Sequence, residues 1–440
     1  MKNFVRCFNH DKFLLVIEGF DHLKDSSGTS KVVKSHELLF HEHGYDYVCI
    51  YPINLTYRIG ITMTGVYGLS VNGKAEGFTG LDNLKFCLAE CERAGHGLAG
   101  ILIHHAIFND LKKLGAFLHA FLETKKVFYL HDYWTCCISI NMMRDKAKNA
   151  WCHSDMKAGC NGCVWKERND QHREEIKRFF DLIGVCEFIA PSESVKREWR
   201  LRNPLGFDLV RVIEHLKPSS VGVRSQESSA DVVRVAFVGA PNINKGWPEF
   251  EYLAKRCKGK VKLYHMGHTD LRIQGVENVD VQIHKQGLNA MVNALNGNNI
   301  DISLLLSGGL ETYSYTLFES LQAKSLVCCF EDSGNVADVI RKTGGGWCFK
   351  NKEALLDFLN SESLPAQVRE KQRIVCFPQA MVTNDEVVSC FAGTPSSVGG
   401  AVLSARYSVL EDVKTWLIVA SIRCFNRFKA VMKAVLKVRS

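Results

Sequence analysis

The sequence lacks an apolar segment long enough to cross a bilayer. A membrane-spanning helix needs about 20 consecutive apolar residues, and every apolar stretch of this chain is interrupted sooner. The first residues also lack the apolar core of a signal peptide, because charged and polar residues alternate with apolar ones there. We therefore expect the protein to stay in the cytosol, peripheral on the inner face of the cell membrane.

Internal repeats and a disulfide framework are missing as well. The 17 cysteines have no secretory context and are scattered through apolar segments such as 47–50 and 326–330. Most of them are expected to be small buried thiols.

The chain does contain enough apolar residues to form the cores of two domains. The chain has 440 residues, of which 46% are hydrophobic, and this length favours two or three domains. In both halves, short apolar segments alternate with helical stretches, which predicts parallel sheets with crossover helices. We expect an α/β protein with two Rossmann-like, doubly wound domains that face each other across a cleft, followed by C-terminal helices.

The composition also indicates where these domains end. Residues 217–232 are rich in serine and poor in large apolar groups, as is typical of a linker. The predicted parts are an N-terminal domain at 1–216 with a cysteine-containing insert at about 136–165, the linker at 217–232, a C-terminal domain at 233–365 and an extension at 366–440.

The most informative motif follows the apolar strand predicted at 302–306. A glycine pair, Gly308 and Gly309, ends this strand, and a helix is expected to begin there with free backbone N–H groups that suit a phosphate. Glu311 and Glu319 follow, with seven residues between them. Because a carboxylate repels a diphosphate, these acids are better suited to sugar hydroxyls. An ordinary solvated helix start would also carry acids, since they offset the helix dipole.

A second motif follows the strand predicted at 233–238. Gly239 allows a turn and is expected to contribute to donor binding, and Lys245 lies where the next helix is expected to start. A lysine at this position can neutralise a leaving diphosphate. The alternative is an ordinary surface lysine after a turn.

Together the two motifs resemble the retaining glycosyltransferases of family 4, whose two Rossmann-like domains form the GT-B fold. The resemblance implies that Glu311 contacts the donor sugar, that Glu319 contacts the ribose of the nucleotide and that Lys245 stabilises the leaving group. It also implies donor contacts from the segment that contains Thr312, Tyr313 and Ser314. Many members carry an arginine shortly before the lysine, where this chain has Asn242 and Asn244.

Polar residues also follow the strand predicted at 126–130. His131 can orient an acceptor hydroxyl or help to pass its proton, and Asp132 can fix nearby groups. In a retaining transfer the departing phosphate itself is thought to take that proton, so a strong base is not required. A lone histidine after a strand is more often a structural group. The string from His131 to Trp134, preceded by His104, resembles family members that build bacterial surface polysaccharides.

Gly28 is a third candidate for phosphate binding, because it lies at the first expected helix start. The family has a glycine-rich loop here, usually with two adjacent glycines, whereas this chain has Ser27 before Gly28. Any tight turn between a strand and a helix can also use a single glycine.

The insert contains cysteines with the spacing of metal ligands. Cys160 and Cys163 are separated by two residues, one of them a glycine that allows a tight turn. Cys152, with Cys137 or His153, would complete four ligands for a structural zinc ion, and buried thiols without a metal are the alternative. A catalytic zinc is not expected, because four protein ligands leave no open position.

The net charge of +8 is concentrated near the C-terminus. Residues 421–440 contain six basic and no acidic side chains, with apolar residues between them at helical spacing. A basic amphipathic helix of this kind suits an anionic membrane surface, where each basic residue contributes about 1 kcal/mol. A terminal helix packed on the protein with a basic outer face is the alternative.

The sequence thus favours a retaining hexosyltransferase that moves a sugar from a nucleotide-diphosphate donor to a glycan or lipid-linked acceptor in capsule, exopolysaccharide or O-antigen synthesis. No catalytic metal is expected, because helix termini and Lys245 can carry the diphosphate charge. The first alternative is a nucleotide-sugar epimerase on the same fold. The second is a module that binds nucleic acid, which is disfavoured because the chain outside the basic tail is nearly neutral.

Overall fold

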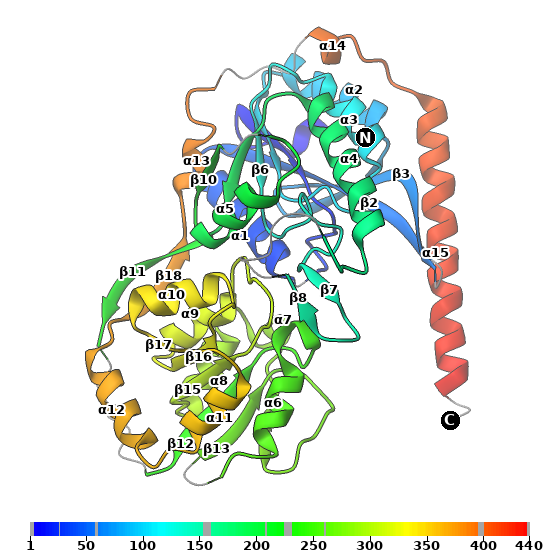
Figure 1. Ribbon diagram of the computed structural model, residues 1–440. Coiled ribbons are helices and arrows are strands. Elements are labelled where there is room, and N and C mark those ends of the chain that lie inside the picture. The colour runs from blue at the N-terminus through cyan, green and yellow to red at the C-terminus, as the bar shows by residue number, and fades with distance from the viewer. Residues whose placement is uncertain are drawn as a thin grey trace.

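The computed structural model describes residues 4–25, 27–57, 60–152, 160–206, 209–223, 231–258, 261–394 and 400–437. Two large sheets organise these residues, and helices cover each of them (Figure 1). The expected fold class, an α/β protein with two Rossmann-like, doubly wound sheets and C-terminal helices, is confirmed.

The N-terminal sheet has eight strands in the order β10-β9-β6-β5-β1-β2-β3-β4. Its strands are β1 (Lys12–Ile17), β2 (Tyr45–Tyr57), β3 (Gly60–Val71), β4 (Lys74–Thr79), β5 (Gly97–Ile103), β6 (Lys126–Tyr129), β9 (Glu187–Ala190) and β10 (Val210–Val212). The helices of this half are η1 (Phe4–Cys7), α1 (Gly28–Glu42), α2 (Leu81–Arg93), α3 (Leu111–His119), α4 (Lys166–Ile183) and α5 (Glu193–Arg202).

Both faces of this sheet are buried, as β1 shows. Phe13, Leu15 and Ile17 belong to one apolar cluster, whereas Leu14 and Val16 belong to another. Successive side chains of a strand point to opposite faces, so helices must cover both sides. For this reason the central strands are uninterrupted apolar runs in the sequence.

The sequence did not predict the antiparallel edge that β2, β3 and β4 form. A tight turn at Asn72 and Gly73 joins β3 to β4, and both residues have positive φ, at 47° and 75°. Asparagine followed by glycine is typical of a two-residue hairpin, because these residues adopt left-handed backbone conformations at the lowest cost.

The C-terminal sheet has six parallel strands in the order β14-β13-β12-β15-β16-β17. Its strands are β12 (Val233–Val238), β13 (Val261–Met266), β14 (Val276–Val279), β15 (Ile302–Leu305), β16 (Leu326–Phe330) and β17 (Gly346–Phe349). Its helices are η2 (Ile243–Lys245), α6 (Trp247–Ala254), α7 (Ile283–Gln286), α8 (Ala290–Gly297), α9 (Tyr315–Gln322), α10 (Asn335–Thr343), α11 (Lys352–Leu359) and α12 (Leu364–Ile374). The apolar pattern of the sequence predicts a strand at 279–283, and this prediction is wrong in position, because β14 ends where that segment begins.

The chain passes between the two sheets twice. β11 (Leu216–Gly222) leaves the N-terminal half and pairs antiparallel with β18 (Phe377–Thr383), which returns to it. The segment expected to be a linker, 217–232, therefore begins as a strand, and its residues 224–230 lie outside the described residues.

The returning chain becomes part of the N-terminal core. After β18 and α13 (Glu386–Ser389), the side chain of Phe391 is buried in the cluster that contains Leu14 and Tyr47. The domain boundaries expected from the sequence stay predictions, and we propose to group residues 386–394 and 400–437 with the N-terminal domain.

The last helices lie on the N-terminal half. α14 (Gly400–Leu403) contacts α2, and α15 (Val409–Lys437) contacts β3, β4 and α2, so that it runs along one edge of the molecule in Figure 1. Glu411 fixes its start, because its carboxylate accepts hydrogen bonds from the backbone N–H groups of Asp82 and Asn83 at 3.3 and 2.6 Å. None of the helices in the described ranges combines the length and the apolar character that crossing a membrane requires.

Candidate functional site

A pocket of about 290 Å³ lies between the two sheets. It is lined by residues from both halves, most of which follow the carboxyl ends of strands, where doubly wound folds bind ligands. From the N-terminal half it is lined by Gly28, Thr29, His131, Asp132, Tyr133, Ile140, Asn141, Trp151 and His215, and from the C-terminal half by Asn242, Asn244, Lys245, Ser307, Gly309, Leu310, Glu311, Thr312, Tyr313 and Tyr315.

Lys245 and Glu311 form an ion pair in this pocket, with 2.7 Å between Nζ and Oε1. Local backbone geometry places the lysine at the end of η2, where its N–H donates to Oδ1 of Asn242 at 3.0 Å. Gly246 follows with φ of 80°, and a side chain there would overlap the carbonyl oxygen of Leu306. The half-exposed lysine thus holds a positive charge in the pocket that an anionic ligand can take over.

The segment around Glu311 differs from the expected helix start. β15 ends at Leu305, and α9 begins only at Tyr315, with Ser314 as its N-cap. The prediction that a helix begins at the glycine pair is therefore wrong. Gly308 and Gly309 instead lie against the indole of Trp151, since an added Cβ would lie 2.7 and 2.4 Å from indole atoms.

Thr312 ties this segment to the N-terminal half. Its hydroxyl donates to the carbonyl oxygen of His131 at 2.7 Å, and its own carbonyl oxygen accepts from the hydroxyl of Ser192 at 2.8 Å. The neighbouring Tyr313 accepts a hydrogen bond on its hydroxyl from the N–H of Leu216 at 3.2 Å. These contacts hold the two walls of the pocket together.

Glu319 lies on α9 and faces the N-terminal half. Its carboxylate is 3.5 Å from Nζ of Lys31 on α1, and the same ammonium group lies 4.9 Å from the centre of the Tyr315 ring. Burial raises the pKa of Glu319, and Lys31 opposes this shift. Among the described residues Tyr315 lines the pocket, whereas Glu319 does not.

A hydrogen-bonded chain leads from His131 into the core. Nε2 of His131 lies 2.8 Å from Nδ1 of His104, and Nε2 of His104 lies 3.0 Å from the hydroxyl of Tyr47. Burial raises the pKa of Tyr47 well above its usual value, so its hydroxyl keeps its proton at neutral pH. Burial, together with neighbouring histidines, lowers the pKa of His104 and His131 well below their usual value, so both rings are neutral.

These protonation states determine which group donates each hydrogen bond from Tyr47 to His131. The Tyr47 hydroxyl has no other hydrogen-bond acceptor among the described residues, so we assign it as the donor to Nε2 of His104. His104 then carries its proton on Nδ1 and donates to Nε2 of His131. His131 is left with its own proton on Nδ1, as a neutral hydrogen-bond donor.

Asp132 is held by two donors. The N–H of Trp134 donates to Oδ1 at 2.8 Å, and Nε2 of His105 lies 2.7 Å from Oδ2. Burial lowers the pKa of His105, Asp132 raises it, and the balance lies above the usual value. Because the N–H of Ile107 donates to Nδ1 of His105 at 3.0 Å, the ring proton sits on Nε2 and points at Asp132.

No family model and no curated protein matches the chain. Among solved structures, sucrose-phosphate synthase from Thermosynechococcus elongatus is similar with a TM-score of 0.50 and 11% identity, over 86% of this chain and 96% of that one. The fold is GT-B. At this identity the similarity concerns the fold alone.

Two further similar structures have lower scores. HepE from Anabaena, solved in complex with UDP-glucose, has a TM-score of 0.48 and 10% identity over 94% of this chain and 99% of that one. WaaG, a glycosyltransferase involved in lipopolysaccharide biosynthesis, has a TM-score of 0.46 and 9% identity over 82% of this chain and 94% of that one.

The two glycines predicted to bind the donor have different surroundings in this GT-B protein. Gly28 lines the pocket as the first residue of α1, and the space beside it is open. Gly239 has φ of 119°, and its N–H already donates to the carbonyl oxygen of Met266 at 2.9 Å. Its backbone N–H is therefore engaged in the turn after β12.

His215 and Trp151 are among the residues that line the pocket and were not predicted from the sequence. His215 follows β10, so its place after a strand end was a usable signal. Trp151 belongs to β8 (Ala150–Trp151), which pairs with β7 (Met143–Asp145) in the insert. No pattern in the sequence indicates that this hairpin contacts the C-terminal half. There the side-chain amide of Asn149 donates a hydrogen bond to Oε1 of Glu249 at 2.9 Å.

The four cysteines predicted as zinc ligands are free thiols. Burial is the main cause that raises the pKa of Cys137 to about 12, and the nearby thiols of Cys152, Cys160 and Cys163 add to the shift. Among the described residues, no three of these sulfurs come within 4.8 Å of one another. The structural zinc site stays a prediction, and its alternative ligand His153 lies outside the described residues.

Proposed function

We propose that the protein is a retaining glycosyltransferase that moves a sugar from a nucleotide-diphosphate donor to a cell-surface glycan or a lipid-linked acceptor. The main support is the convergence of Lys245 and Glu311 from one half with His131, Asp132 and the start of α1 from the other, all in one pocket of a GT-B fold.

The diphosphate of the donor binds next to Lys245. This lysine is paired only with Glu311 among the described residues, and a diphosphate offers its ammonium group a stronger, doubly charged partner. The first turns of α1 and α9 contain no acidic residue, so their positive ends favour an anion as well.

The sugar then contacts Glu311. When the diphosphate takes over Lys245, the Glu311 carboxylate is released to accept hydrogen bonds from sugar hydroxyls. His131 offers an N–H to an oxygen of the substrate, since its proton lies on Nδ1. Both groups act on the same bound donor from opposite walls of the pocket.

The transfer step exchanges one bond at the anomeric carbon for another. The acceptor oxygen bonds to this carbon on the face from which the diphosphate departs, and the bond between the carbon and the phosphate oxygen breaks. The hydroxyl proton passes to the departing phosphate, so the nucleoside diphosphate leaves with it. Lys245 stabilises the charge that builds up on the leaving group, and no catalytic metal is required in this scheme.

The acceptor is presented at a membrane surface. On the described part of α15, the side chains of Leu410, Val413, Trp416 and Leu417 are largely exposed, while Thr415 is buried against the domain. An exposed apolar stripe on a helix with a basic continuation suits an anionic bilayer. A membrane-bound acceptor matches synthesis of a surface polysaccharide.

The proposal is tested by replacing the donor-binding carboxylate. Nucleotide sugars are first screened for thermal stabilisation, because a ligand that binds only the folded state raises the melting temperature. With the best donor, Glu311→Gln is expected to lower turnover by about 100-fold or more, since it removes a charged contact to the reacting sugar. Glu353→Gln, an exposed carboxylate on α11, is the control and should keep full activity.

Turnover of Glu311→Gln at the rate of the parent would contradict the proposed donor site. The same assay without an acceptor separates the epimerase alternative, because an epimerase alters the free nucleotide sugar on its own. Product analysis by NMR reports the anomeric configuration and so tests retention directly.

A further inference from the structure

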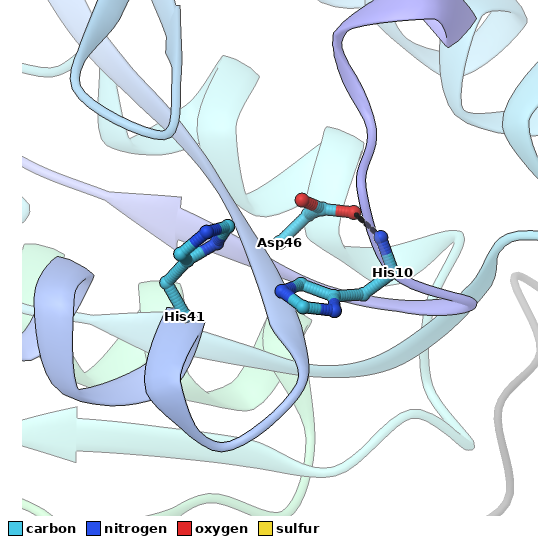
Figure 2. A group of neighbouring side chains, drawn as sticks. All are labelled: His10, His41 and Asp46. Carbon is cyan, nitrogen blue, oxygen red and sulfur yellow. Dashed lines mark hydrogen bonds between the residues drawn. The ribbon is translucent and has the colours of Figure 1, made fainter.

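A group of metal-capable side chains lies at the end of the N-terminal sheet opposite to the pocket. His10 precedes β1, His41 lies in the last turn of α1 and Asp46 is the second residue of β2. One ligand atom from each residue lies within 4.8 Å of the other two. Figure 2 shows the two imidazole rings turned toward each other, with the carboxylate beside them.

The two histidines each carry a buried nitrogen that lacks a partner. Nε2 of His10 and Nδ1 of His41 are inaccessible to solvent and have no hydrogen-bond partner within the described part of the chain. The ring centres are only 4.7 Å apart. A buried polar atom without a partner is costly, and a metal ion can satisfy both lone pairs at once.

The carboxylate of Asp46 is buried and already oriented. It accepts hydrogen bonds from the backbone N–H groups of Asn9 and His10, at 3.0 and 2.8 Å, and from the side-chain amide of Asn72 at 2.7 Å. All of these donors are neutral, and no lysine or arginine pairs with Asp46 among the residues described. Ligating carboxylates typically have such hydrogen-bond support.

We propose that His10, His41 and Asp46 bind a divalent transition metal ion, for which zinc is the best match. Two imidazoles and one carboxylate are ligands that zinc accepts, whereas calcium and magnesium prefer oxygen alone. Water takes the fourth position. The ion links the segment before β1, the end of α1 and the start of β2, so its role is to stabilise the N-terminal domain, independently of the proposed transferase activity.

The first experiment uses the full-length protein after removal of metal with a chelator. Zinc is added during thermal unfolding, and a rise of the melting temperature by several degrees is expected, because the ion binds the folded state. Cobalt is then used as a spectroscopic probe. A site of nitrogen and oxygen ligands gives visible d–d bands without the intense charge-transfer absorption that thiolates produce.

The variants His10→Gln and His41→Gln separate this site from the cysteines. Both are expected to bind zinc at least about 10-fold more weakly and to lose the temperature rise. His43→Gln, an exposed histidine just after the same helix, is the matched control and should respond like the parent.

An unchanged zinc response in His10→Gln and His41→Gln would overturn the proposal, and so would a parent protein that does not respond to zinc. A cobalt spectrum that shows thiolate ligation alone, with no ion bound by nitrogen and oxygen ligands, would do the same. This spectrum is measured on the parent protein, so it decides the question even where a variant does not fold.

Discussion

The hydroxyl of Tyr47 is buried in the core, yet it influences the pocket through two histidines. It donates to His104, which donates to His131, and so it determines which nitrogen of His131 carries the proton. Tyr47 touches no substrate, and we regard it as a positioning residue.

We predict that Tyr47→Phe lowers kcat about 10-fold, which corresponds to one hydrogen bond of roughly 1.4 kcal/mol. Without the hydroxyl, His104 can turn its proton toward Nε2, and His131 then changes its tautomer. Steady-state kinetics with the identified donor measure the effect, which should appear in kcat more than in KM.

Tyr45→Phe is the control for this variant. The Tyr45 hydroxyl is also buried, but it donates to the carbonyl oxygen of Phe391, away from the pocket. If both variants lowered kcat to the same extent, the role of Tyr47 would be merely structural.

At the scale of single residues, the sequence predicted those site residues that belong to short local motifs. Glu311, Lys245 and His131 were proposed from short motifs, and the structure brings all three to the same pocket. Trp151 was not predicted, because the residues next to it in the sequence do not indicate that it covers the glycine pair in the other half.

Among the structural elements, the turn between η2 and α6 leaves no room for a side chain at its glycine. Gly246 combines a positive φ of 80° with a position where an added Cβ would lie 1.9 Å from the carbonyl oxygen of Leu306. A larger residue at position 246 must therefore displace either this turn or the end of β15. Lys245 is then displaced as well.

We predict that Gly246→Ala destabilises the protein by more than about 3 kcal/mol and abolishes donor binding. Left-handed strain accounts for about 1–2 kcal/mol, and the overlap with the backbone accounts for the rest. Denaturant unfolding and a thermal shift with the donor are the measurements.

Gly275→Ala isolates the strain from the overlap. Gly275 has a similar φ of 79°, but no atom lies within 4 Å of an added Cβ. It should cost only about 1–2 kcal/mol and leave donor binding intact. Equal losses of stability in the two variants would show that the overlap is unimportant.

Most elements could be predicted, because an apolar run covered on both faces is visible in the sequence. The start of α9 could not be predicted. The glycine pair suggested that a helix begins there, whereas α9 begins only at Tyr315. The glycines are needed because an indole from the other half packs closely against them. This contact forms only in the tertiary structure.

For the whole molecule, the proposed membrane contact depends on the position of α15. The helix is anchored at its start by Glu411 and leaves Trp416 and Leu417 exposed at 69% and 52%. We predict that Trp416→Ala combined with Leu417→Ala weakens binding to anionic vesicles at least about 10-fold, because two apolar anchors are lost. Vesicle co-sedimentation measures this binding.

Truncation after Thr415 should abolish vesicle binding, since it also removes the basic residues. Leu288→Ala, an equally exposed apolar residue in the C-terminal half, should have no effect. Unchanged binding after truncation would mean that the helix is only packed on the fold.

The sequence by itself determined the two α/β halves and the residues expected to carry charge in the pocket. Both depend on local patterns: apolar runs bounded by turns, and polar residues placed after strands. Only the tertiary structure decided that Lys245 pairs with Glu311, that Trp151 crosses to the other half and that Phe391 returns to the N-terminal core. These contacts join residues far apart in the chain, and their free energy comes from surfaces that meet only after both sheets have formed.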